Sequence, residues 1–459
     1  MTGNHAGCRR IAVIGAGPSG LFAAQALAGQ DTLDVEVDLY DRLPTPYGLL
    51  RYGVAPDHTS IKAVANALAK VLESPRISFT GLVEFGRDVA REELLQAYDA
   101  VVYAVGAPRD LTMGIPGEDL PGSGSAREFV EWYGGHPDAR PQSLAGVTGA
   151  ATIGVGNVAL DVGRILAKQA HALTTTDMPD PVLAELAASP ITDVWIIGRR
   201  GPQHAAFTTN ELRELTRLDG VQLIIDPAHL EGIDEEGLDR RTRTNLGILR
   251  DAAAAPRDPD APRRLHLLFW HRPVRLDGAD RVESLTVERT RLDADVPVAD
   301  PALAPPPARV VGTGELSTLP VQLVLRAIGY RGAPLPGVPF DEVRAVIPHD
   351  EGRVLDAPGG TRCPREYVTG WIKRGPTGVI GTNKSDAAQS VAHLLEDLAA
   401  VPPQEPQLNV VDLLAARGVC PATFADWQAI DAAEQARGAA RGRARTKLGT
   451  WEELGAVIG

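Results

Sequence analysis

Two parts of the chain share the same order of apolar and polar positions. Residues 11–14 and 151–153 are short apolar runs, and each ends at a glycine-rich turn before a helical stretch, residues 21–28 and 158–169. A short apolar run bounded by glycine is typical of a buried strand. We therefore predict an α/β fold with two Rossmann-like units, each built on a parallel sheet.

The first turn has the G-x-G-x-x-G pattern at Gly15, Gly17 and Gly20. In this setting the first glycine permits the tight turn, the second lets a pyrophosphate approach the backbone, and the third lets helix and strand pack closely. A second strand-like run, residues 35–40, ends at Asp41, whose carboxylate can accept hydrogen bonds from a ribose diol. The pattern predicts a dinucleotide site, with a purely structural turn as the alternative.

The second turn repeats the pattern at Gly154 and Gly156, with Ala159 in the third place, where the motif permits alanine. Its helix is followed by an excursion containing proline and threonine, residues 173–190, and only then by the strand-like run 194–197. We predict a second dinucleotide site with a looser motif than the first.

Arg199 and Arg200 follow the run 194–197, where an NAD site would have an acidic residue. Two guanidinium groups there would clamp a 2′-phosphate, which favours NADP. A solvated basic turn is the alternative, because charged residues are common on loops.

Two further buried strands, residues 98–106 and 323–329, end at glycine turns and indicate how the domains are connected. We predict that an NADP domain, residues 107–331, is inserted into a first domain formed by residues 1–106 and 332–459. The proline-rich stretches are expected to be surface loops between amphipathic strands, and a polar helical tail follows Pro403. These loops cover residues 255–262 and 301–307, and the strands are residues 265–270 and 282–288.

Composition and charge exclude several classes of protein. The 459 residues are 44% hydrophobic and 23% charged, and 46 Lys and Arg against 59 Asp and Glu give a net charge of −13. These proportions are those of a globular protein and argue against intrinsic disorder. The acidic excess repels nucleic acid and anionic membranes, so we expect neither as a partner.

The chemistry is expected to come from a bound organic cofactor or from ordinary side chains, because metal and disulfide motifs are absent from the sequence. Cys8, Cys363 and Cys420 are far apart and form no C-x-x-C pair, and the ten histidines show no H-E-x-x-H spacing. We expect no metal site.

Arg9 and Arg10 precede an uncharged run, residues 11–30, that superficially resembles a twin-arginine export signal. Its glycines make it a poor continuous spanning helix. We expect a cytoplasmic protein.

Four longer motifs carry a resemblance to a known family. They cover residues 44–58, 154–161, 198–202 and 370–383, with the sequences PTPYGLLRYGVAPDH, GVGNVALD, GRRGP and GWIKRGPTGVIGTN. In this order the chain resembles the adrenodoxin reductase type of ferredoxin–NADP reductase over residues 11–395. The tail around residues 427–447 is similar to that of bacterial members.

The resemblance implies FAD in the first site and NADP(H) in the second, with hydride passing to the flavin and single electrons passing to an iron-sulfur ferredoxin. Flavin suits this task because it accepts two electrons together and releases them singly. Phe85 would contact the adenine side through its backbone, and Trp371 has a core aromatic as its alternative reading. The FAD residues implied are Gly15, Gly17, Ser19, Gly20, Asp41, Leu49, Phe85, Trp371, Gly378, Val379 and Ile380.

For NADP(H) the resemblance implies contacts from the second glycine turn and the two arginines. One departure is that Leu111 stands where the family tends to have arginine, while Arg109 lies two residues earlier. The residues implied are Val155, Gly156, Asn157, Val158, Arg199, Arg200, Glu211 and Gly378.

His58 and Glu211 are the candidate active-site residues, because the family match puts both near the flavin. We expect positioning and electrostatic roles, with proton exchange as a secondary possibility. The alternatives are a histidine that fixes a loop and a charge at a helix N-terminus. Asp161 and Arg164, one helical turn apart, are expected to form an intrahelical ion pair.

A basic face is the candidate docking surface for the ferredoxin. Arg240, Arg243 and Arg250 fall near one face of a predicted helix over residues 238–250, with Arg241 adjacent. Ferredoxins are generally acidic, so such a face would steer them. A solvated surface is the alternative.

Other flavoenzymes of the same general fold are the competing readings. The absence of C-x-x-C argues against a disulfide reductase, and the absence of an N-terminal cysteine cluster argues against a glutamate synthase small subunit. A sensor that binds FAD and NADP without turnover is an alternative from a different class. Reduction of the flavin by NADPH would distinguish the enzyme from such a sensor.

Overall fold

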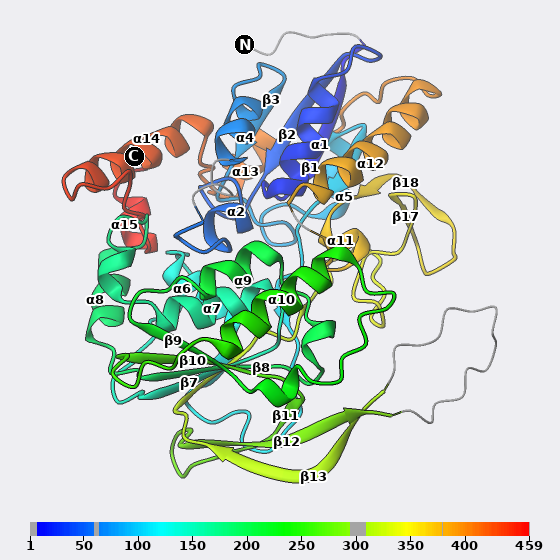
Figure 1. Ribbon diagram of the computed structural model, residues 1–459. Coiled ribbons are helices and arrows are strands. Elements are labelled where there is room, and N and C mark those ends of the chain that lie inside the picture. The colour runs from blue at the N-terminus through cyan, green and yellow to red at the C-terminus, as the bar shows by residue number, and fades with distance from the viewer. Residues whose placement is uncertain (1–6, 59–63, 294–308, 379, 459) are drawn as a thin grey trace. The chain divides into compact units, whose positions relative to one another are not determined.

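A computed structural model describes residues 7–58, 64–293, 309–378 and 380–458. The chain divides into two compact units, and Figure 1 shows that each contains a sheet flanked by helices. Unit 1 comprises Met1–Asp110, Gly134–Asp138 and Gly329–Gly459. Unit 2 comprises Leu111–Tyr133 and Ala139–Ile328.

Unit 1 contains a seven-stranded sheet within the described residues. Its central strands are parallel, as a Rossmann-like unit requires, and two antiparallel strands extend one edge. In spatial order the strands are β16 (His349–Asp350), β17 (Arg353–Leu355), β18 (Arg362–Val368), β4 (Ala100–Tyr103), β1 (Arg9–Ile14), β2 (Val35–Tyr40) and β3 (Ile77–Thr80).

Both faces of this sheet are covered, which explains the unbroken apolar run of β1. Ile11 and Val13 face a core with one group of helices, whereas Ala12 and Ile14 face a core with another group. The first group is α1 (Pro18–Ala28), α4 (Val64–Leu72), α12 (Thr382–Ala399) and α14 (Phe424–Ala439), and the second is α5 (Arg91–Ala97), α11 (Trp371–Arg374) and α13 (Val410–Ala416).

Unit 2 contains a six-stranded sheet whose described pairings are all parallel. In spatial order the strands are β6 (Ser123–Ser125), β14 (Leu323–Arg326), β7 (Gly149–Ile153), β8 (Asp193–Ile197), β10 (Arg263–Leu268) and β9 (Val221–Ile225). Helices cover one face, namely α6 (Ala126–Tyr133), α7 (Asn157–Ala167), α8 (Asp180–Ala188), α9 (Thr209–Leu215) and α10 (Arg240–Ala254). A small antiparallel sheet covers the other, formed by β11 (His271–Asp277), β12 (Ser284–Leu292) and β13 (Val310–Leu319).

The predicted strand–turn–helix units are confirmed at β1–α1 and β7–α7, and the buried strands at β4 and β14 are confirmed as well. The excursion predicted over residues 173–190 lies between α7 and β8, and its second half contains helix α8, which was not predicted. Pro181 lies in the first turn of α8, where a missing N–H does not break a helix. Residues 255–262 connect α10 to β10 as expected, whereas residues 301–307 lie outside the described residues.

The connections between the units differ slightly from the predicted boundaries at 106 and 331. Strand β5 (Arg109–Asp110) pairs with β15 (Tyr330–Arg331), so the two crossing segments are joined to each other. This ladder holds both segments in unit 1. Unit 2 therefore begins at Leu111 and ends at Ile328, and residues Gly134–Asp138 between these limits belong to unit 1.

The twin arginines are part of the fold of unit 1. Arg9 and Arg10 begin β1, and the buried Arg9 guanidinium pairs with Asp99 at 3.2 Å. Within the described ranges no helix is long and apolar enough to cross a membrane.

Candidate functional sites

The first glycine turn has the geometry of a phosphate cradle. Gly15 has a φ of +104°, and a Cβ there would lie 2.7 Å from the Ala104 carbonyl oxygen. A Cβ on Gly20 would lie 1.8 Å from the Gly15 carbonyl oxygen, so only glycine lets α1 pack this closely on β1. Around a Cβ built on Gly17, by contrast, no atom of the described residues lies within 4 Å. The turn is closed on the protein side and open at Gly17, which fits a bound pyrophosphate.

Asp41 connects the end of β2 to this turn. Its carboxylate accepts a hydrogen bond from the Ala16 N–H at 2.8 Å and another from the Leu43 N–H at 3.0 Å. Desolvation raises the pKa of Asp41, and the two amide bonds oppose that rise. A carboxylate has about four acceptor positions, so these amides leave acceptor capacity for ribose hydroxyls.

Unit 1 contains a cavity of about 450 Å³ that the sequence analysis did not predict. Some of its lining residues are direct sequence neighbours of Asp41 and Phe85. Asp138 forms its wall by accepting from the Arg42 guanidinium at 2.5 Å and from the Trp451 indole N–H at 2.7 Å. The lining residues are Arg42, Leu82, Glu84, Arg87, Asp138 and Trp451. No local pattern announces it, because Trp451 and Asp138 are distant in sequence from Arg42.

The start of α2 (Leu49–Tyr52) lies against the first glycine turn. The Tyr47 N–H donates to the Ala16 carbonyl at 2.9 Å, and a Cβ on Gly48 would lie 3.0 Å from the Gly17 Cα. Gly48 has a φ of +48°, so glycine is required both by its conformation and by its closeness to the turn. Leu49, which follows, is 44% exposed next to the open side of the turn.

Trp371 begins α11 and is half-buried, so it is not a residue of the closed core. Its ring stacks on Tyr330 with centroids 5.8 Å apart. Gly378 lies nearby in sequence with a φ of +83°, and a Cβ there would meet Thr382 at 2.7 Å. Ile380 packs at the edge of the core, whereas Val379 lies outside the described residues.

A network missed by the sequence analysis joins this segment to the first turn. Asp386, on α12, accepts from the Gly370 N–H at 2.6 Å and from Arg374 at 2.9 Å. Asn383 accepts from Arg374 at 2.8 Å and from the Ser19 hydroxyl at 3.0 Å. The Ser19 proton is thus used within the protein, which leaves the Ser19 oxygen as an acceptor. An acidic residue in the second turn of α12 offered no signal for this role in the sequence.

Phe85 is half-buried, and its ring packs edge-on against Tyr103 with centroids 5.7 Å apart. The side chain therefore belongs to the packing of unit 1. A backbone contact to a ligand remains the expected role of this position.

The second glycine turn, in unit 2, has the same construction. Gly154 has a φ of +133°, and a Cβ there would lie 2.3 Å from the Ala327 carbonyl oxygen. For a Cβ built on Gly156, the described part of the chain offers no neighbour within 4 Å. The buried Ala159 takes the third place and accepts a bond from Thr152 through its carbonyl at 3.2 Å. This turn also fits a pyrophosphate.

The loop before α9 is bound to this second turn. The Ala206 N–H donates to the Val155 carbonyl at 3.0 Å, and the Thr208 N–H donates to the Asn157 side chain at 2.9 Å. Thr208 is the N-cap of α9 and accepts from the Glu211 N–H at 3.4 Å. Glu211 is thereby held in the first turn of α9, close to the residues 155–158 with which the resemblance groups it.

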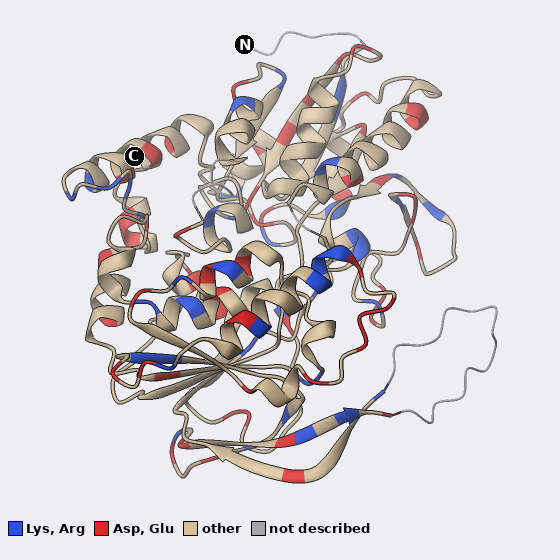
Figure 2. Ribbon diagram, viewed as in Figure 1, with Lys and Arg blue, Asp and Glu red and all other residues tan. Residues whose placement is uncertain are grey.

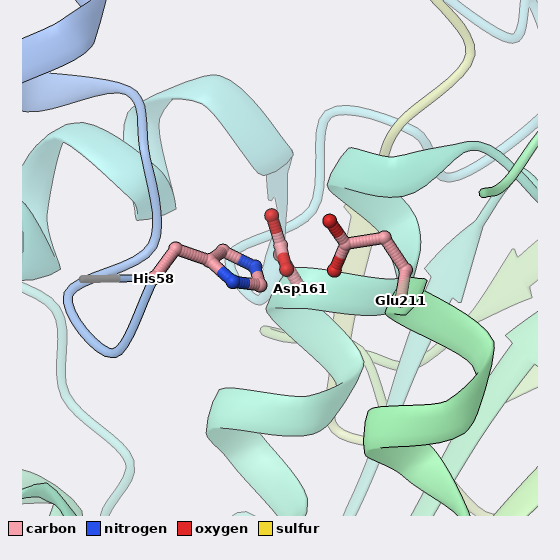
Figure 3. A group of neighbouring side chains, drawn as sticks. All are labelled: His58, Asp161 and Glu211. Carbon is pink, nitrogen blue, oxygen red and sulfur yellow. The ribbon is translucent and has the colours of Figure 1, made fainter. Parts of the chain in front are cut away.

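Glu211 lies beside a second carboxylate. Figure 3 shows Glu211 on α9 and Asp161 on α7, and their ligand oxygens lie within 4.8 Å of each other. The predicted ion pair between Asp161 and Arg164 is confirmed at 2.7 Å, and Arg164 also reaches Glu214 at 3.4 Å. A buried guanidinium thus balances part of the acidic charge.

His58, also drawn in Figure 3, belongs to unit 1. It ends the turn that follows α2, and its backbone N–H donates to the Ala55 carbonyl at 3.0 Å. The imidazole is buried.

Arg199 and Arg200 form the turn that follows β8. The Arg199 carbonyl accepts from the Thr290 hydroxyl at 2.9 Å, and the Arg200 carbonyl accepts from the Trp270 N–H at 3.2 Å. The backbone of the turn is fixed, while the Arg199 side chain is exposed and that of Arg200 is half-buried. Leu111 starts unit 2, and Arg109 lies in β5.

The predicted basic helix is confirmed as α10, which begins at Arg240 behind an Asp239 N-cap. Figure 2 shows basic residues at its start and an acidic loop before it. All four candidate arginines are exposed, namely Arg240, Arg241, Arg243 and Arg250. Arg250 is paired with Glu235 at 2.5 Å, so its charge is partly neutralised.

Comparisons with known proteins find similarity to pyridine nucleotide oxidoreductases. The family model for pyridine nucleotide-disulphide oxidoreductases matches residues 9–200. NADPH-ferredoxin reductase FprA of Mycobacterium tuberculosis strain H37Rv is 45% identical, with 97% of this chain and 98% of that protein covered. The mitochondrial NADPH:adrenodoxin oxidoreductase of Homo sapiens is 40% identical, with 98% and 92% covered.

Solved structures give the same picture. The structure of M. tuberculosis FprA in complex with NADPH has a TM-score of 0.90 and 44% identity, and it covers 98% of this chain and 99% of that one. Another structure of FprA, described as carrying a covalent modification of NADP+, matches with the same score and identity.

Proposed function

The chain belongs to the adrenodoxin reductase type of ferredoxin–NADP reductase, and from this membership we propose that it carries electrons from NADPH through FAD to an iron-sulfur ferredoxin. The observation that carries the proposal is the pair of open glycine cradles, one in each unit, at Gly17 and Gly156. Each cradle is closed by neighbouring backbone except where a pyrophosphate would lie.

Unit 1 supplies the residues that would hold FAD. The backbone at Gly17 would bind the pyrophosphate and Asp41 the ribose, while Leu49, Trp371 and Gly378 would border the ring system. Bound flavin supplies the conversion between a two-electron donor and a one-electron acceptor. Two contacts with the glycine turn support this assignment. Asp41 accepts a hydrogen bond from the turn, and the Tyr47–Leu49 segment packs against it.

Unit 2 supplies the residues that would hold NADP(H). The second glycine turn would bind the pyrophosphate, and Arg199 and Arg200 would bind the 2′-phosphate. The fixed backbone of their turn supports this assignment, because it presents the two guanidinium groups from a rigid base. A rigid base lowers the entropy lost when the phosphate binds.

We assign His58 and Glu211 positioning and electrostatic roles. Glu211 is held by the N-cap of α9 next to the glycine turn, and a negative charge there favours a cationic ring. Proton exchange at these two side chains is proposed as a secondary role.

The ferredoxin partner is proposed to dock on α10. Arg240, Arg241 and Arg243 are exposed on its first turns, and we give them more weight than Arg250, whose charge Glu235 offsets. Reversing Arg240 and Arg243 to glutamate should raise the KM for ferredoxin and flatten its salt dependence, with NADPH oxidation by a small dye unchanged. An unaltered salt dependence would place docking elsewhere.

We also propose a cytoplasmic location. Residues 9–28, which imitate an export signal, form β1 and α1 of unit 1, and their removal would destroy the sheet.

The test of the proposed function is the colour and redox behaviour of the purified protein. It should be yellow, and denaturation should release one FAD, because no covalent anchor is part of the proposal. NADPH added without oxygen should bleach the flavin rapidly. A protein that remains colourless after incubation with FAD contradicts the proposal, and a yellow protein that NADPH does not bleach over minutes supports a sensor instead.

A further inference from the structure

The C-terminal part of unit 1 contains a completely buried carboxylate that no step of the proposed reaction uses. Glu434, on α14, has 0% of its surface exposed. It accepts two hydrogen bonds from the Arg51 guanidinium, at 3.0 and 2.5 Å, and one from the Leu448 N–H at 2.9 Å. Arg445 lies 3.2 Å away on the same carboxylate. The sequence distance between Arg51 and Glu434 is 383 residues.

A buried lysine reaches the same short helix from the other side. The Lys447 ammonium donates to the carbonyl of Arg51 at 2.5 Å and to the carbonyl of Gly134 at 2.8 Å. The Arg51 guanidinium lies 4.9 Å from the Tyr52 ring and 5.1 Å from the Trp427 ring. Both the backbone and the side chain of Arg51 are therefore fixed by residues of the C-terminal segment.

These charges are tolerated inside the protein only as a set. Burial acts to raise the pKa of Glu434, but the charge and hydrogen bonds of Arg51 and the Leu448 amide outweigh it, so that the pKa is lowered. Loss of one member leaves another charge desolvated without its partner. Charge pairing and hydrogen bonds therefore hold the C-terminal segment on Arg51 in one specific arrangement, which apolar packing alone would not impose.

Arg51 lies in α2, the helix that borders the first glycine turn. Gly48, which precedes α2, would touch Gly17 with any side chain, and Leu49 opens the helix beside that turn. Tyr47, just before them, also packs edge-on against Trp427, with ring centroids 5.6 Å apart. The position of the Tyr47–Tyr52 backbone against the turn therefore depends on contacts from residues 427–447.

We propose that Glu434 and Lys447 are positioning residues for FAD: they fix α2 so that Gly48 and Leu49 line the cofactor site. The inference rests on the proposed function, since it assumes that FAD occupies unit 1. It gives the C-terminal segment a role in cofactor binding, through Arg51, although neither residue is expected to touch the flavin.

The test compares Glu434→Gln and Lys447→Met with the unaltered chain and with Glu452→Gln, a control that removes an exposed carboxylate from α15 (Trp451–Gly455). FAD is removed from each protein, and its dissociation constant is measured by flavin fluorescence. The visible circular dichroism of the bound flavin and the dissociation constant of NADP+ are measured as well. We expect FAD to bind at least tenfold more weakly in both variants with altered dichroism, and NADP+ affinity to stay within twofold.

Equal FAD affinity and an unchanged flavin spectrum in both variants would overturn the inference. A parallel loss of FAD and NADP+ affinity would do the same, because it would indicate general destabilisation. If neither variant folds, amide hydrogen exchange of the unaltered chain decides: FAD should slow exchange in residues 434–448 as well as in α2, and no change there contradicts the inference. An unaltered chain that binds no FAD would contradict the proposed function itself.

Discussion

A single methyl group at Gly156 should separate nucleotide binding from folding. Gly156 is the N-cap of α7, with φ −102° and ψ 175°, an extended conformation that alanine adopts without strain. A Cβ there has no neighbour within 4 Å among the described residues. Replacing Gly156 with alanine should therefore change the free energy of unfolding by less than about 1 kcal/mol, the net of a weaker N-cap and a less flexible unfolded chain.

The same methyl group would occupy the space assigned to the NADP(H) pyrophosphate. A hydrogen bond from a backbone N–H to a charged phosphate oxygen contributes about 1.5 to 3 kcal/mol. Displacing the phosphate from one such bond should raise the dissociation constant of NADP+ roughly 10- to 150-fold, since about 1.4 kcal/mol is a factor of ten.

Calorimetric titration with NADP+ measures this change, and thermal unfolding with FAD content checks the fold. Gly247→Ala is the matched control, because it adds a methyl group in equally open space on α10, in the same unit. The control should bind NADP+ as the unaltered chain does. If Gly156→Ala also binds NADP+ normally, no pyrophosphate lies against this turn, and the assignment of unit 2 is refuted.

Three further predictions concern charge. Replacing Arg199 and Arg200 together with alanine should cost at least tenfold in selectivity for NADPH over NADH, because each charge-assisted contact contributes on the order of 1.5 to 3 kcal/mol; steady-state KM values measure it, and equal losses for both nucleotides would mean a structural role. Alanine at His58 or at Glu211 should change the stopped-flow rate of flavin reduction by NADPH with FAD content intact, and unchanged rates with unchanged NADPH affinity would remove that residue from the active site. The lowered pKa of Glu434 means that its contribution to stability is present above its ordinary pKa of 4.5 and is lost as pH falls through the folded value. The free energy of unfolding, measured with urea at a series of pH values, should therefore fall more steeply in acid for the unaltered chain than for Glu434→Gln. If the two proteins lose stability in parallel as the pH falls, the carboxylate is not ionised in the folded protein.

The parts of the structure that were predicted correctly depend on neighbours in sequence. The turn at Gly15, Gly17 and Gly20 and the helix after it are set by backbone conformation and by spacing within one short segment, and sequence reports both. The apolar run of β1 is equally local, because a strand covered on both faces carries apolar residues at every position. Such features need no knowledge of the rest of the chain.

The parts that were missed depend on distant residues. Asp386 accepts hydrogen bonds from Gly370 and Arg374. Nothing in the sequence of its helix distinguishes it from an ordinary acidic residue. The pairing of Arg51 with Glu434 spans the whole of unit 2 in sequence, and a charged residue in a polar tail is normally solvated. Helix α8 was not predicted, although its proline is compatible with the first turn of a helix.

The central claim is that the chain passes electrons from NADPH to a ferredoxin. Cytochrome c reduction by NADPH, measured with and without each ferredoxin of the host, tests it most directly, because cytochrome c reports electrons that have left the enzyme. The account predicts a slow basal rate and strong stimulation by at least one ferredoxin, lost when Gly156 is replaced with alanine at limiting NADPH. Rapid oxidation of NADPH that no ferredoxin stimulates would contradict it.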